Sequence, residues 1–403
     1  METTVSSLSP AAIPAAASAR VAPPSRFLEL DGFRGFALIM VIFSHFWGIY
    51  YRVPNHPVVA GLLWFFDEGG LGLDAFFVLS GFLIGGILLN TRPSPNYFKT
   101  FYVRRFYRVL PISYLWVLLY ALAAVIGVAW FHARSESFRS ICPLPLYLLS
   151  LQSWFVVGGW TWWPHPLRYA WYFLGPMWSL SVEEQYYFIA PALVKSLSRR
   201  RLAYALISIV VAAPILRFAL IRWMPLGPDA AFSWLPCRMD SLSLGMLAAL
   251  LADSAAGREW IRQHVRLLYG LISMCVLLEI CLKLLQQHSY TLIGSTVGKS
   301  ANALLASFVI LVLVYDPGSR MAAVCRWGWV RYLAKISYCV YLIQLGVALV
   351  FYKLLLHGPP PIYMTLRVAG VSLIALIATL ILASVSWRYF EQPLVRLGHR
   401  YKY

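Results

Sequence analysis

The sequence predicts an all-α, polytopic integral membrane protein: a helical bundle of about ten transmembrane helices, with the N- and C-termini on the cytoplasmic side. Of its 403 residues, 60% are apolar and only 12% are charged, which is too apolar for a large soluble domain. Several apolar runs reach about twenty residues, the length of a helix that crosses a bilayer core. The Lys and Arg residues behind the net charge of +18 stand in short clusters between these runs. This pattern indicates positive-inside topology and argues against nucleic-acid binding.

The chain divides into three parts. Residues 1–25 are rich in Ala, Ser and Pro and lack a long apolar core, which predicts a disordered cytoplasmic tail and not a cleaved signal peptide. Residues 26–397 form the membrane domain, and residues 398–403 form a second short cytoplasmic tail. The ten predicted spans lie near 32–51, 71–90, 109–131, 173–194, 202–222, 237–253, 267–285, 298–315, 332–356 and 366–388.

An eleventh apolar window, residues 143–157, is short and interrupted by Pro145. If it crossed the membrane, the basic run at residues 195–201 would lie outside, and every later loop would invert. Without it, most of the 34 Lys and Arg residues fall on one side, as positive-inside topology requires. We therefore expect a multi-pass protein of the inner (plasma) membrane, with residues 132–172 as a long outer loop.

Two ionisable residues stand in the first predicted span, Arg34 and His45. Ionisable groups are costly in hydrocarbon, so a histidine retained there is a candidate functional residue. Eleven residues amount to about three helical turns plus 20°, so the two side chains share one face and are separated by roughly 16 Å along the axis. The topology puts Arg34 near the cytoplasmic surface and His45 in the outer half of the span.

Three arginines in the segment RRFYR, Arg104, Arg105 and Arg108, lie at the cytoplasmic mouth of the third span. The planar guanidinium group matches phosphate oxygens bidentately, so with Arg34 these residues form a candidate site for a phosphorylated ligand. Ordinary positive-inside anchoring is the alternative interpretation.

Three carboxylates are further candidates, since they fall within predicted spans. Glu183 and Glu184 lie near the middle of the fourth span, and because neighbouring helix positions point about 100° apart, only one of them can face a ligand squarely. The other is then expected to pair with Arg217, Arg238 or a helix end. Asp74 stands near the outer start of the second span, where a capping role at the helix N-terminus competes with a catalytic one. Ser80 and Gly81 in that span suggest close helix packing.

The remaining polar residues predict neither a metal site nor a nucleotide-binding loop. No HExxH, cysteine cluster or GxxxxGK is present in the sequence, and the other seven histidines fall in loops or at helix ends. Arg238 and Asp240 are expected to form buried charge pairs with other spans. Glu279 and Lys283 have the spacing of a local ion pair.

Taken together, these blocks resemble the membrane acyltransferase family 3, which includes bacterial O-acetyltransferases of surface polysaccharides and of some small molecules. The matching blocks run in family order over about 30–397: LDGFRGFALIMVIFSH, GLGLDAFFVLSGFLIGG, YFKTFYVRRFYRVLPISYL, WSLSVEEQYYF, CRMDSLSLGMLAALL, ISYCVYLIQ and WRYFEQPLVRLG. Arg34 and His45 match the family's pattern of arginine, ten residues, then histidine. Many family members carry a histidine at the position of Gln344, so any role of that histidine is absent or replaced here.

The resemblance implies transfer of an acyl group, acetyl in the simplest case, from acyl-CoA as a donor substrate to a hydroxyl of a glycan, a lipid-linked sugar or a small molecule. No permanently bound cofactor is expected. Arg34, Arg104, Arg105 and Arg108 would hold the nucleotide phosphates, and the pantetheine arm would reach toward His45. His45 would act as a general base or as a transient acyl carrier, with Glu183, Glu184 or Asp74 assisting.

Two other classes of function remain open at this point. Intramembrane His, Asp and Glu residues are also typical of proton-coupled transporters, so a transporter or flippase of an anionic or lipid-linked substrate is the main alternative. In a membrane scaffold, Arg34 and His45 would be replaceable without loss of function. Acyl-CoA turnover by the purified protein separates an enzyme from both.

Overall fold

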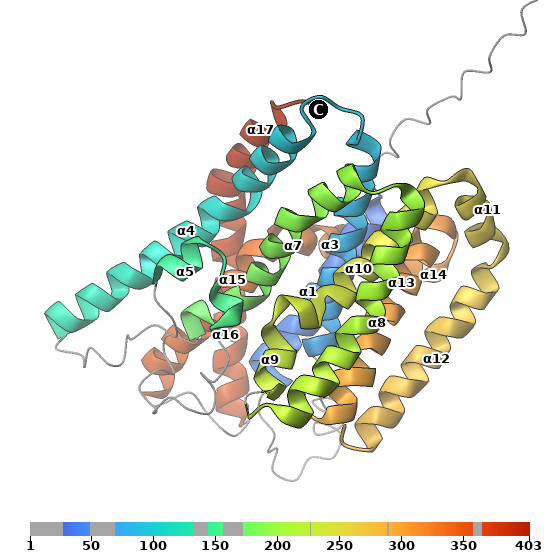
Figure 1. The fold of residues 1–403 in the computed structure, drawn as a ribbon. Helices are drawn as coiled ribbons and strands as arrows, with labels where there is room; N and C mark the ends of the chain where they lie inside the picture. Colours follow the sequence, from blue (N-terminus) through green and yellow to red (C-terminus); the bar gives the residue numbers. More distant parts are fainter. Residues whose placement is uncertain are drawn as a thin grey trace, which may run out of the picture.

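The computed structural model describes residues 27–48, 69–131, 144–155, 172–225, 227–287, 290–357 and 365–403. In these ranges the regular structure is entirely helical, which confirms the predicted fold class (Figure 1). The predicted disordered tail at 1–25 and most of the predicted outer loop at 132–172 lie outside the described residues.

Nine helices of the described chain are long and apolar enough to cross a membrane. They comprise α1 (Leu28–Phe43) with the π-helical turn η1 (Ser44–Gly48), α3 (Gly69–Thr91), α4 (Tyr97–Phe131), α8 (Arg199–Trp223), α9 (Gly227–Ser233) with α10 (Leu235–Asp253), α12 (Val265–Leu284), η5 (Gly294–Gly298) with α13 (Lys299–Tyr315), α15 (Gly328–Leu356), and α16 (Leu366–Ser386) with η6 (Trp387–Glu391) and α17 (Gln392–His399). Each coincides with one of the predicted spans.

The predicted fourth span is also a helix, α7 (Met177–Ser196), although it is not among the nine. Its C-terminal end is tied to the turn between α3 and α4, because Arg92 donates hydrogen bonds to the carbonyl oxygens of Leu197 at 2.8 Å and Lys195 at 3.3 Å. The rejected window at 143–157 holds only two short helices, α5 (Leu144–Leu148) and η3 (Gln152–Trp154). Neither is long enough to cross a bilayer.

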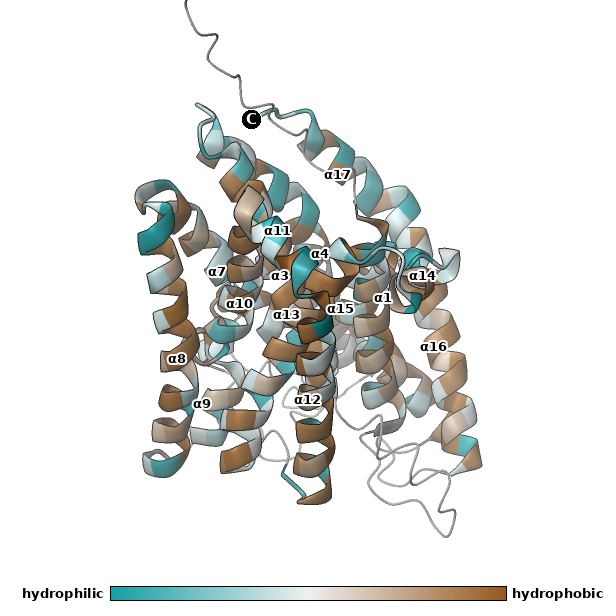
Figure 2. Cartoon of the chain, turned by 90° about the vertical axis from the view of Figure 1, so that its right-hand side faces the viewer, coloured by the Kyte–Doolittle hydropathy of each residue, from teal (hydrophilic) through white to brown (hydrophobic). Residues whose placement is uncertain are grey.

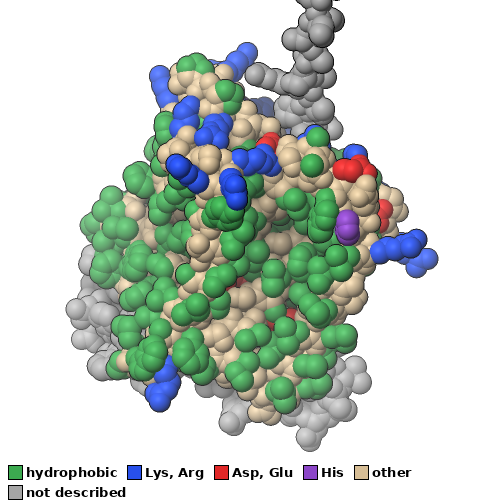
Figure 3. Space-filling model, turned by 45° about the vertical axis from the view of Figure 1, so that its right-hand side comes forward, with side chains coloured by type: hydrophobic (Ala, Val, Ile, Leu, Met, Phe, Trp, Pro, Cys, Tyr) green, Lys and Arg blue, Asp and Glu red, His purple; other side chains and the backbone are tan. Residues whose placement is uncertain are grey.

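We call the end of the bundle at which α1 begins and α3 ends the basic end. The short helices α11 (Ala255–Gln263) and α14 (Arg320–Cys325) also lie there. Most of the Lys and Arg side chains visible in Figure 3 gather at this end, above a body covered with hydrophobic side chains. This distribution matches the positive-inside pattern on which the predicted topology rests.

Small residues let the central helices approach closely. A Cβ at Gly81 on α3 would clash with the backbone carbonyl oxygen of Leu242 on α10, and a Cβ at Gly245 would clash with that of Val78. This contact between α3 and α10 is the close packing that the sequence predicted at Gly81. The outer helices α8, α12 and α16 instead carry many exposed apolar side chains, and much of their length is coloured as hydrophobic in Figure 2. Such surfaces suit contact with lipid.

Candidate active site

A cavity of about 1890 Å³ is lined by residues of α1, α3, α4, α7, α10, α11, α13, α15, η6 and α17. Its lining includes residues at the basic end, such as Pro93, Arg258 and Tyr403, and residues deep in the bundle. On α3 the lining residues run from Leu73 to Thr91, a rise of roughly 27 Å at 1.5 Å per residue. The cavity therefore extends from the basic end far into the membrane-spanning region.

All four predicted phosphate-binding arginines line this cavity: Arg34, Arg104, Arg105 and Arg108. Arg34 lies close enough to Arg105 and Arg108 to interact with them electrostatically. Within the described part of the chain, no carboxylate comes within ion-pair distance of these three guanidinium groups. Asp31, Glu183 and Glu391 interact with these arginines at longer range and offset part of their charge. Clustered arginines nevertheless create a positive field that attracts an anion.

Arg104 differs from the other three, because its guanidinium group already binds the protein's own backbone. Its Nε and Nη2 atoms donate hydrogen bonds to the Tyr401 carbonyl oxygen at 2.9 and 2.6 Å, and its guanidinium group lies 4.8 Å from the centre of the Tyr403 ring. Thr100 donates a further hydrogen bond to the Lys402 carbonyl oxygen at 2.9 Å. Burial raises the pKa of the Tyr403 hydroxyl, so this ring is neutral at physiological pH and stacks as an uncharged partner of Arg104.

Deeper in the cavity, α3 and α7 contribute a hydrogen-bonded cluster of Ser80, Glu183 and Tyr187. The Ser80 and Tyr187 hydroxyls are in direct contact, and the Glu183 carboxylate interacts with both. Arg105 lies over the Tyr187 ring, 5.0 Å from its centre. The sequence had indicated only helix packing for Ser80, and it had not singled out Tyr187, although its spacing of four residues from Glu183 puts both on one face of α7.

Glu184 does not line the cavity. Arg105, Tyr187 and Tyr338 interact electrostatically with both glutamates, and Glu184 also interacts with Tyr114 on α4. Of the two adjacent glutamates, only Glu183 therefore borders the cavity, in keeping with the 100° between neighbouring helix positions.

Asp74 forms part of a buried charge network outside the cavity lining. Its carboxylate accepts hydrogen bonds from Arg238 at 2.7 Å and from Ser241 at 3.1 Å, and both charged side chains are about 1% exposed. Because α3 begins at Gly69, Asp74 lies beyond the first turn and does not cap the helix.

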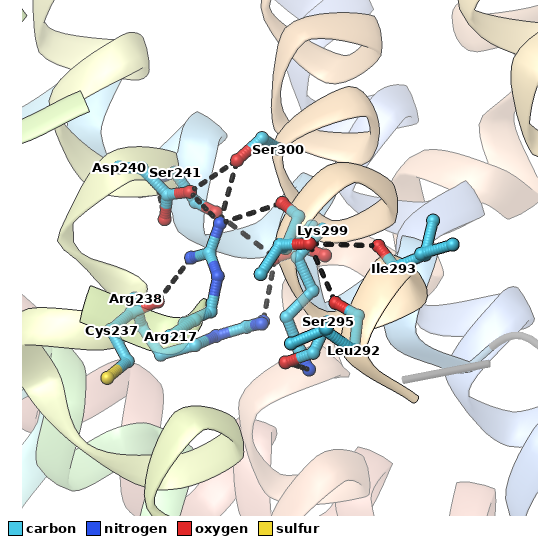
Figure 4. A network of polar contacts seen from close by, with 12 residues as sticks. Arg217, Cys237, Arg238, Asp240, Ser241, Leu292, Ile293, Ser295, Lys299 and Ser300 are labelled. Carbon is cyan, nitrogen blue, oxygen red and sulfur yellow. Dashed lines mark hydrogen bonds and ion pairs between the residues drawn. The ribbon is translucent and has the colours of Figure 1, made fainter. Parts of the chain in front are cut away.

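A second pair continues the network toward α8 and α13. Arg217 lies 2.8 Å from Asp240 and also donates to the Cys237 carbonyl and to Ser300 (Figure 4). Arg217 and Arg238 therefore pair with aspartates, and the expected pairing of either with a glutamate of α7 is absent from the ion pairs of the described residues. The predicted burial of Arg238 and Asp240 in interhelical charge pairs is confirmed.

His45 lies in the π-helical turn η1 that continues α1. Its imidazole lies beside Gln344 of α15, a fully buried residue. The His45 Nδ1 atom and the Gln344 Oε1 atom are both buried and have no hydrogen-bond partner among the described residues. The ideal spacing used to place Arg34 and His45 on one face assumes 3.6 residues per turn, and the wider turn at residues 44–48 alters that register.

His45 does not line the cavity, but the cavity comes close to it. Tyr341 is the last lining residue along α15, and Gln344, the neighbour of His45, follows three residues later on the same helix face. The rise between these two positions is roughly 4.5 Å. Only about one helical turn therefore separates the floor of the cavity from the level of His45.

The fold and this arrangement of residues define an integral membrane protein with a deep cationic cavity that leads toward a buried histidine. A family model described as an acyltransferase domain, Acyl_transf_3, matches residues 27–388. The chain therefore belongs to this acyltransferase family, as the sequence blocks predicted.

Three of the similar proteins illustrate the range of the family. The chain is 27% identical over 394 residues to the putative peptidoglycan O-acetyltransferase YrhL of Bacillus subtilis (strain 168), covering 92% of this chain and 55% of the relative. It is 23% identical over 388 residues to the O-acetyltransferase OatA of Staphylococcus aureus (strain NCTC 8325 / PS 47), covering 92% and 57%. It is 25% identical over 382 residues to the putative O-acetyltransferase SACOL0978 of Staphylococcus aureus (strain COL), again covering 92% and 57%.

This chain thus spans a little over half the length of these relatives. No solved structure matches the chain.

Proposed function

We propose that this chain is a membrane-embedded O-acyltransferase that takes an acyl group, acetyl in the simplest case, from acyl-CoA at the basic end and delivers it to a hydroxyl of an acceptor. One observation carries the proposal: a single cavity is lined by Arg34, Arg105 and Arg108 and ends about one helical turn from the level of His45. A donor with phosphates at one end and a thioester at the end of a long arm suits such a cavity.

The three arginines would hold the phosphates of CoA. Guanidinium groups bind phosphate oxygens bidentately, and these three have no competing ion pair among the described carboxylates. Arg104 would act differently, since its N–H groups already hold the backbone at Tyr401. We assign it to fixing the C-terminal segment at the rim of the donor site.

The cluster of Ser80, Glu183 and Tyr187 lies on the path of the pantetheine arm. Hydroxyl groups and a carboxylate supply the donors and acceptors that the two amides of the arm need inside a bilayer. We further propose that this cluster provides the proton that the CoA sulfur takes up when the carbon–sulfur bond of the thioester breaks.

His45 would act on the thioester carbonyl in one of two ways. As a general base it would remove the proton of the acceptor hydroxyl while the new carbon–oxygen bond forms. As a nucleophile it would itself form a carbon–nitrogen bond and carry the acyl group to an acceptor at the opposite end of the bundle. In both routes one thioester is consumed, one ester is formed and free CoA thiol is released.

A glycan hydroxyl is the acceptor that we favour, because two relatives are named as an O-acetyltransferase and a putative peptidoglycan O-acetyltransferase. A glycan acceptor at the cell surface requires that the basic end face the cytoplasm, where acyl-CoA is found, and that the protein reside in the inner membrane. The positive-inside pattern supports this orientation.

The test is a thioester assay with the protein purified into lipid nanodiscs. We expect the wild-type chain to release CoA thiol from acetyl-CoA when a muropeptide or sugar acceptor is added, and His45→Ala to abolish this release while still inserting and eluting as a monodisperse species. A transporter or a scaffold would leave the thioester intact. Turnover by His45→Ala at the wild-type rate would refute the assignment of His45.

A further inference from the structure

The floor of the cavity is formed by side chains of three helices. On α3 the deepest lining residues are Leu73, Phe76 and Phe77, on α15 the deepest is Tyr341, and on α7 it is Ser179. Beyond Tyr341, the next turn of α15 carries Gln344 beside His45. The floor therefore stands between the donor cavity and the histidine.

Two aromatic rings of the floor, Phe76 on α3 and Tyr341 on α15, pack against each other. The Phe76 and Tyr341 ring centres are 6.4 Å apart, with an interplanar angle of 61°, so the edge of one ring meets the face of the other. This arrangement is favourable for aromatic pairs. Tyr341 is only 8% exposed, and Phe76 is partly exposed toward the cavity.

A pair of hydrogen bonds fixes the Tyr341 ring. Ser179 donates its hydroxyl proton to the Pro176 carbonyl oxygen at 3.1 Å. A serine hydroxyl has only one proton to donate, so the Tyr341 hydroxyl, 2.6 Å from Ser179 Oγ, must be the donor in the second bond. The ring is thereby anchored to the first turn of α7 and does not swing freely.

We propose that Phe76 and Tyr341 form a gate that limits the acyl chain delivered to His45 to a short one, so that this pair determines which acyl-CoA the protein uses. The inference rests on the proposed function and adds the selection of the acyl group to it. For the thioester carbon to approach His45 to the roughly 3–3.5 Å of a reactive geometry, the acyl group must enter the space next to these two rings.

A longer acyl chain would have to displace the hydrogen-bonded ring of Tyr341. One additional methylene group in a close-fitting pocket changes the rate by about 10–200-fold. The phosphate and pantetheine contacts are the same for every acyl-CoA, so the gate predicts that acetyl-CoA and butyryl-CoA bind with similar KM values and differ in kcat. If the two aromatic residues served only core packing, their substitution would not change the ratio of the kcat values for the two donors.

The experiment measures kcat and KM with acetyl-CoA and butyryl-CoA for the wild-type protein in nanodiscs and for three variants. We expect the wild type to turn over butyryl-CoA at least about 10-fold more slowly than acetyl-CoA. Phe76→Ala, which opens the floor, should raise the butyryl-to-acetyl ratio of kcat by about 10-fold or more. Tyr341→Phe keeps the ring but removes its anchor, and should raise the ratio by a smaller factor.

Phe82→Ala is the matched control, since Phe82 lies on the same helix and lines the same cavity but is six residues nearer to the basic end. Its ratio should equal that of the wild type. A wild type that uses both donors equally, or a Phe76→Ala ratio no higher than that of Phe82→Ala, would overturn the gate while leaving acyl transfer in place. A wild type that consumes neither thioester would refute the proposed function itself, and the gate with it.

Discussion

His45 and Gln344 lie side by side beyond the floor of the cavity, and each carries a buried polar atom without a partner among the described residues, Nδ1 in His45 and Oε1 in Gln344. Buried polar atoms in folded proteins are nearly always hydrogen-bonded. In the proposed reaction, the acceptor hydroxyl would supply the missing hydrogen-bond partner at this place. Gln344 also occupies the position at which many members of the family carry a histidine.

Changing Gln344 should alter catalysis through the His45 imidazole. An amide can orient an imidazole but cannot take up its proton. Gln344→Leu is therefore expected to lower kcat by about 10-fold, less than the 10²–10⁴-fold that a general acid–base group itself contributes. Gln344→His should stay active and add a second titratable group beside His45, which changes the shape of the pH–rate profile. Profiles of kcat against pH for the three proteins test this. An unchanged kcat in Gln344→Leu would contradict the role of Gln344.

Substitutions of the adjacent residues Arg104 and Arg105 should have two different effects. Arg105→Ala removes a charge-assisted contact worth about 1.5–3 kcal/mol, so the Kd for acetyl-CoA should rise about 10–100-fold in isothermal titration. Arg105→Lys retains the charge without the planar fork, so its Kd for acetyl-CoA should lie between those of Arg105→Ala and the wild type.

Arg104→Ala should instead release the C-terminal segment, because two hydrogen bonds to the Tyr401 carbonyl oxygen are lost. We expect faster endoproteolytic cleavage of the segment around Tyr401 and a much smaller change in Kd. If Arg104→Ala weakens acetyl-CoA binding as strongly as Arg105→Ala, the division of roles between the two arginines is wrong.

The helices were predictable because their signal is local. An apolar run of about twenty residues specifies a span by its own length, and the basic clusters sort the loops without knowledge of the packing. Rejecting residues 143–157 as a span relied on equally visible features, Pro145 and the basic run at residues 195–201, and the described part of this window holds only two short helices. The predicted topology then brought Arg34 and the segment of Arg104, Arg105 and Arg108 to the cytoplasmic surface, as one expected site.

The interior of the site was not predictable, because no local pattern says which face of an apolar helix borders a cavity. Ser80 and Tyr187 are 107 residues apart, and Ser80 lies next to Gly81, whose role in close packing was recognised. The pairing of Arg238 with Asp74 across 164 residues was hidden for the same reason. The π-helical turn at His45 was not predicted either. The sequence analysis assumed a regular α-helix through this residue, and no local pattern in the sequence marks the change of helix type.

The orientation of the basic end can be tested by cysteine labelling. Asn96 lies in the turn between α3 and α4 at the basic end, and Leu285 follows α12 at the opposite end, and both are exposed. In a background with Cys142 and the exposed Cys281 replaced by serine, Asn96→Cys should react with a membrane-impermeant maleimide only from the cytoplasmic face, and Leu285→Cys only from the outer face. Labelling of Asn96→Cys in intact spheroplasts would invert the topology and place the arginines on the side that lacks acyl-CoA.

The buried pair of Asp74 and Arg238 should be structural, and a charge-removal series can show it. Asp74→Asn leaves a buried guanidinium group without its counter-ion, which costs about 3–5 kcal/mol, and should lower the apparent Tm in nanodiscs. The double variant Asp74→Leu with Arg238→Met removes both charges and should recover much of that loss. Asp253→Asn is the control, because its pair with Arg199 is 31% and 44% exposed and is worth less than about 1 kcal/mol.

Activity in the double variant then decides the role of Asp74. If the stable double variant retains acyl transfer, Asp74 serves the fold alone. A folded double variant that has lost transfer with unchanged Kd for acetyl-CoA would instead assign Asp74 a part in the chemistry.

Two glycines of α3 should respond in opposite directions to the same substitution. A Cβ at Gly81 meets the backbone of α10 at Leu242, whereas a Cβ at Gly86 meets no described atom within 4 Å. Gly81→Ala therefore forces α3 and α10 apart, and we expect a loss of about 1–3 kcal/mol, the usual cost of overpacking. Gly86→Ala only replaces a poor helix former with the best one and should gain up to about 1 kcal/mol. Apparent Tm values of both variants in the same nanodiscs provide the comparison, and a Gly81→Ala protein at least as stable as the wild type would contradict the close approach of α3 and α10.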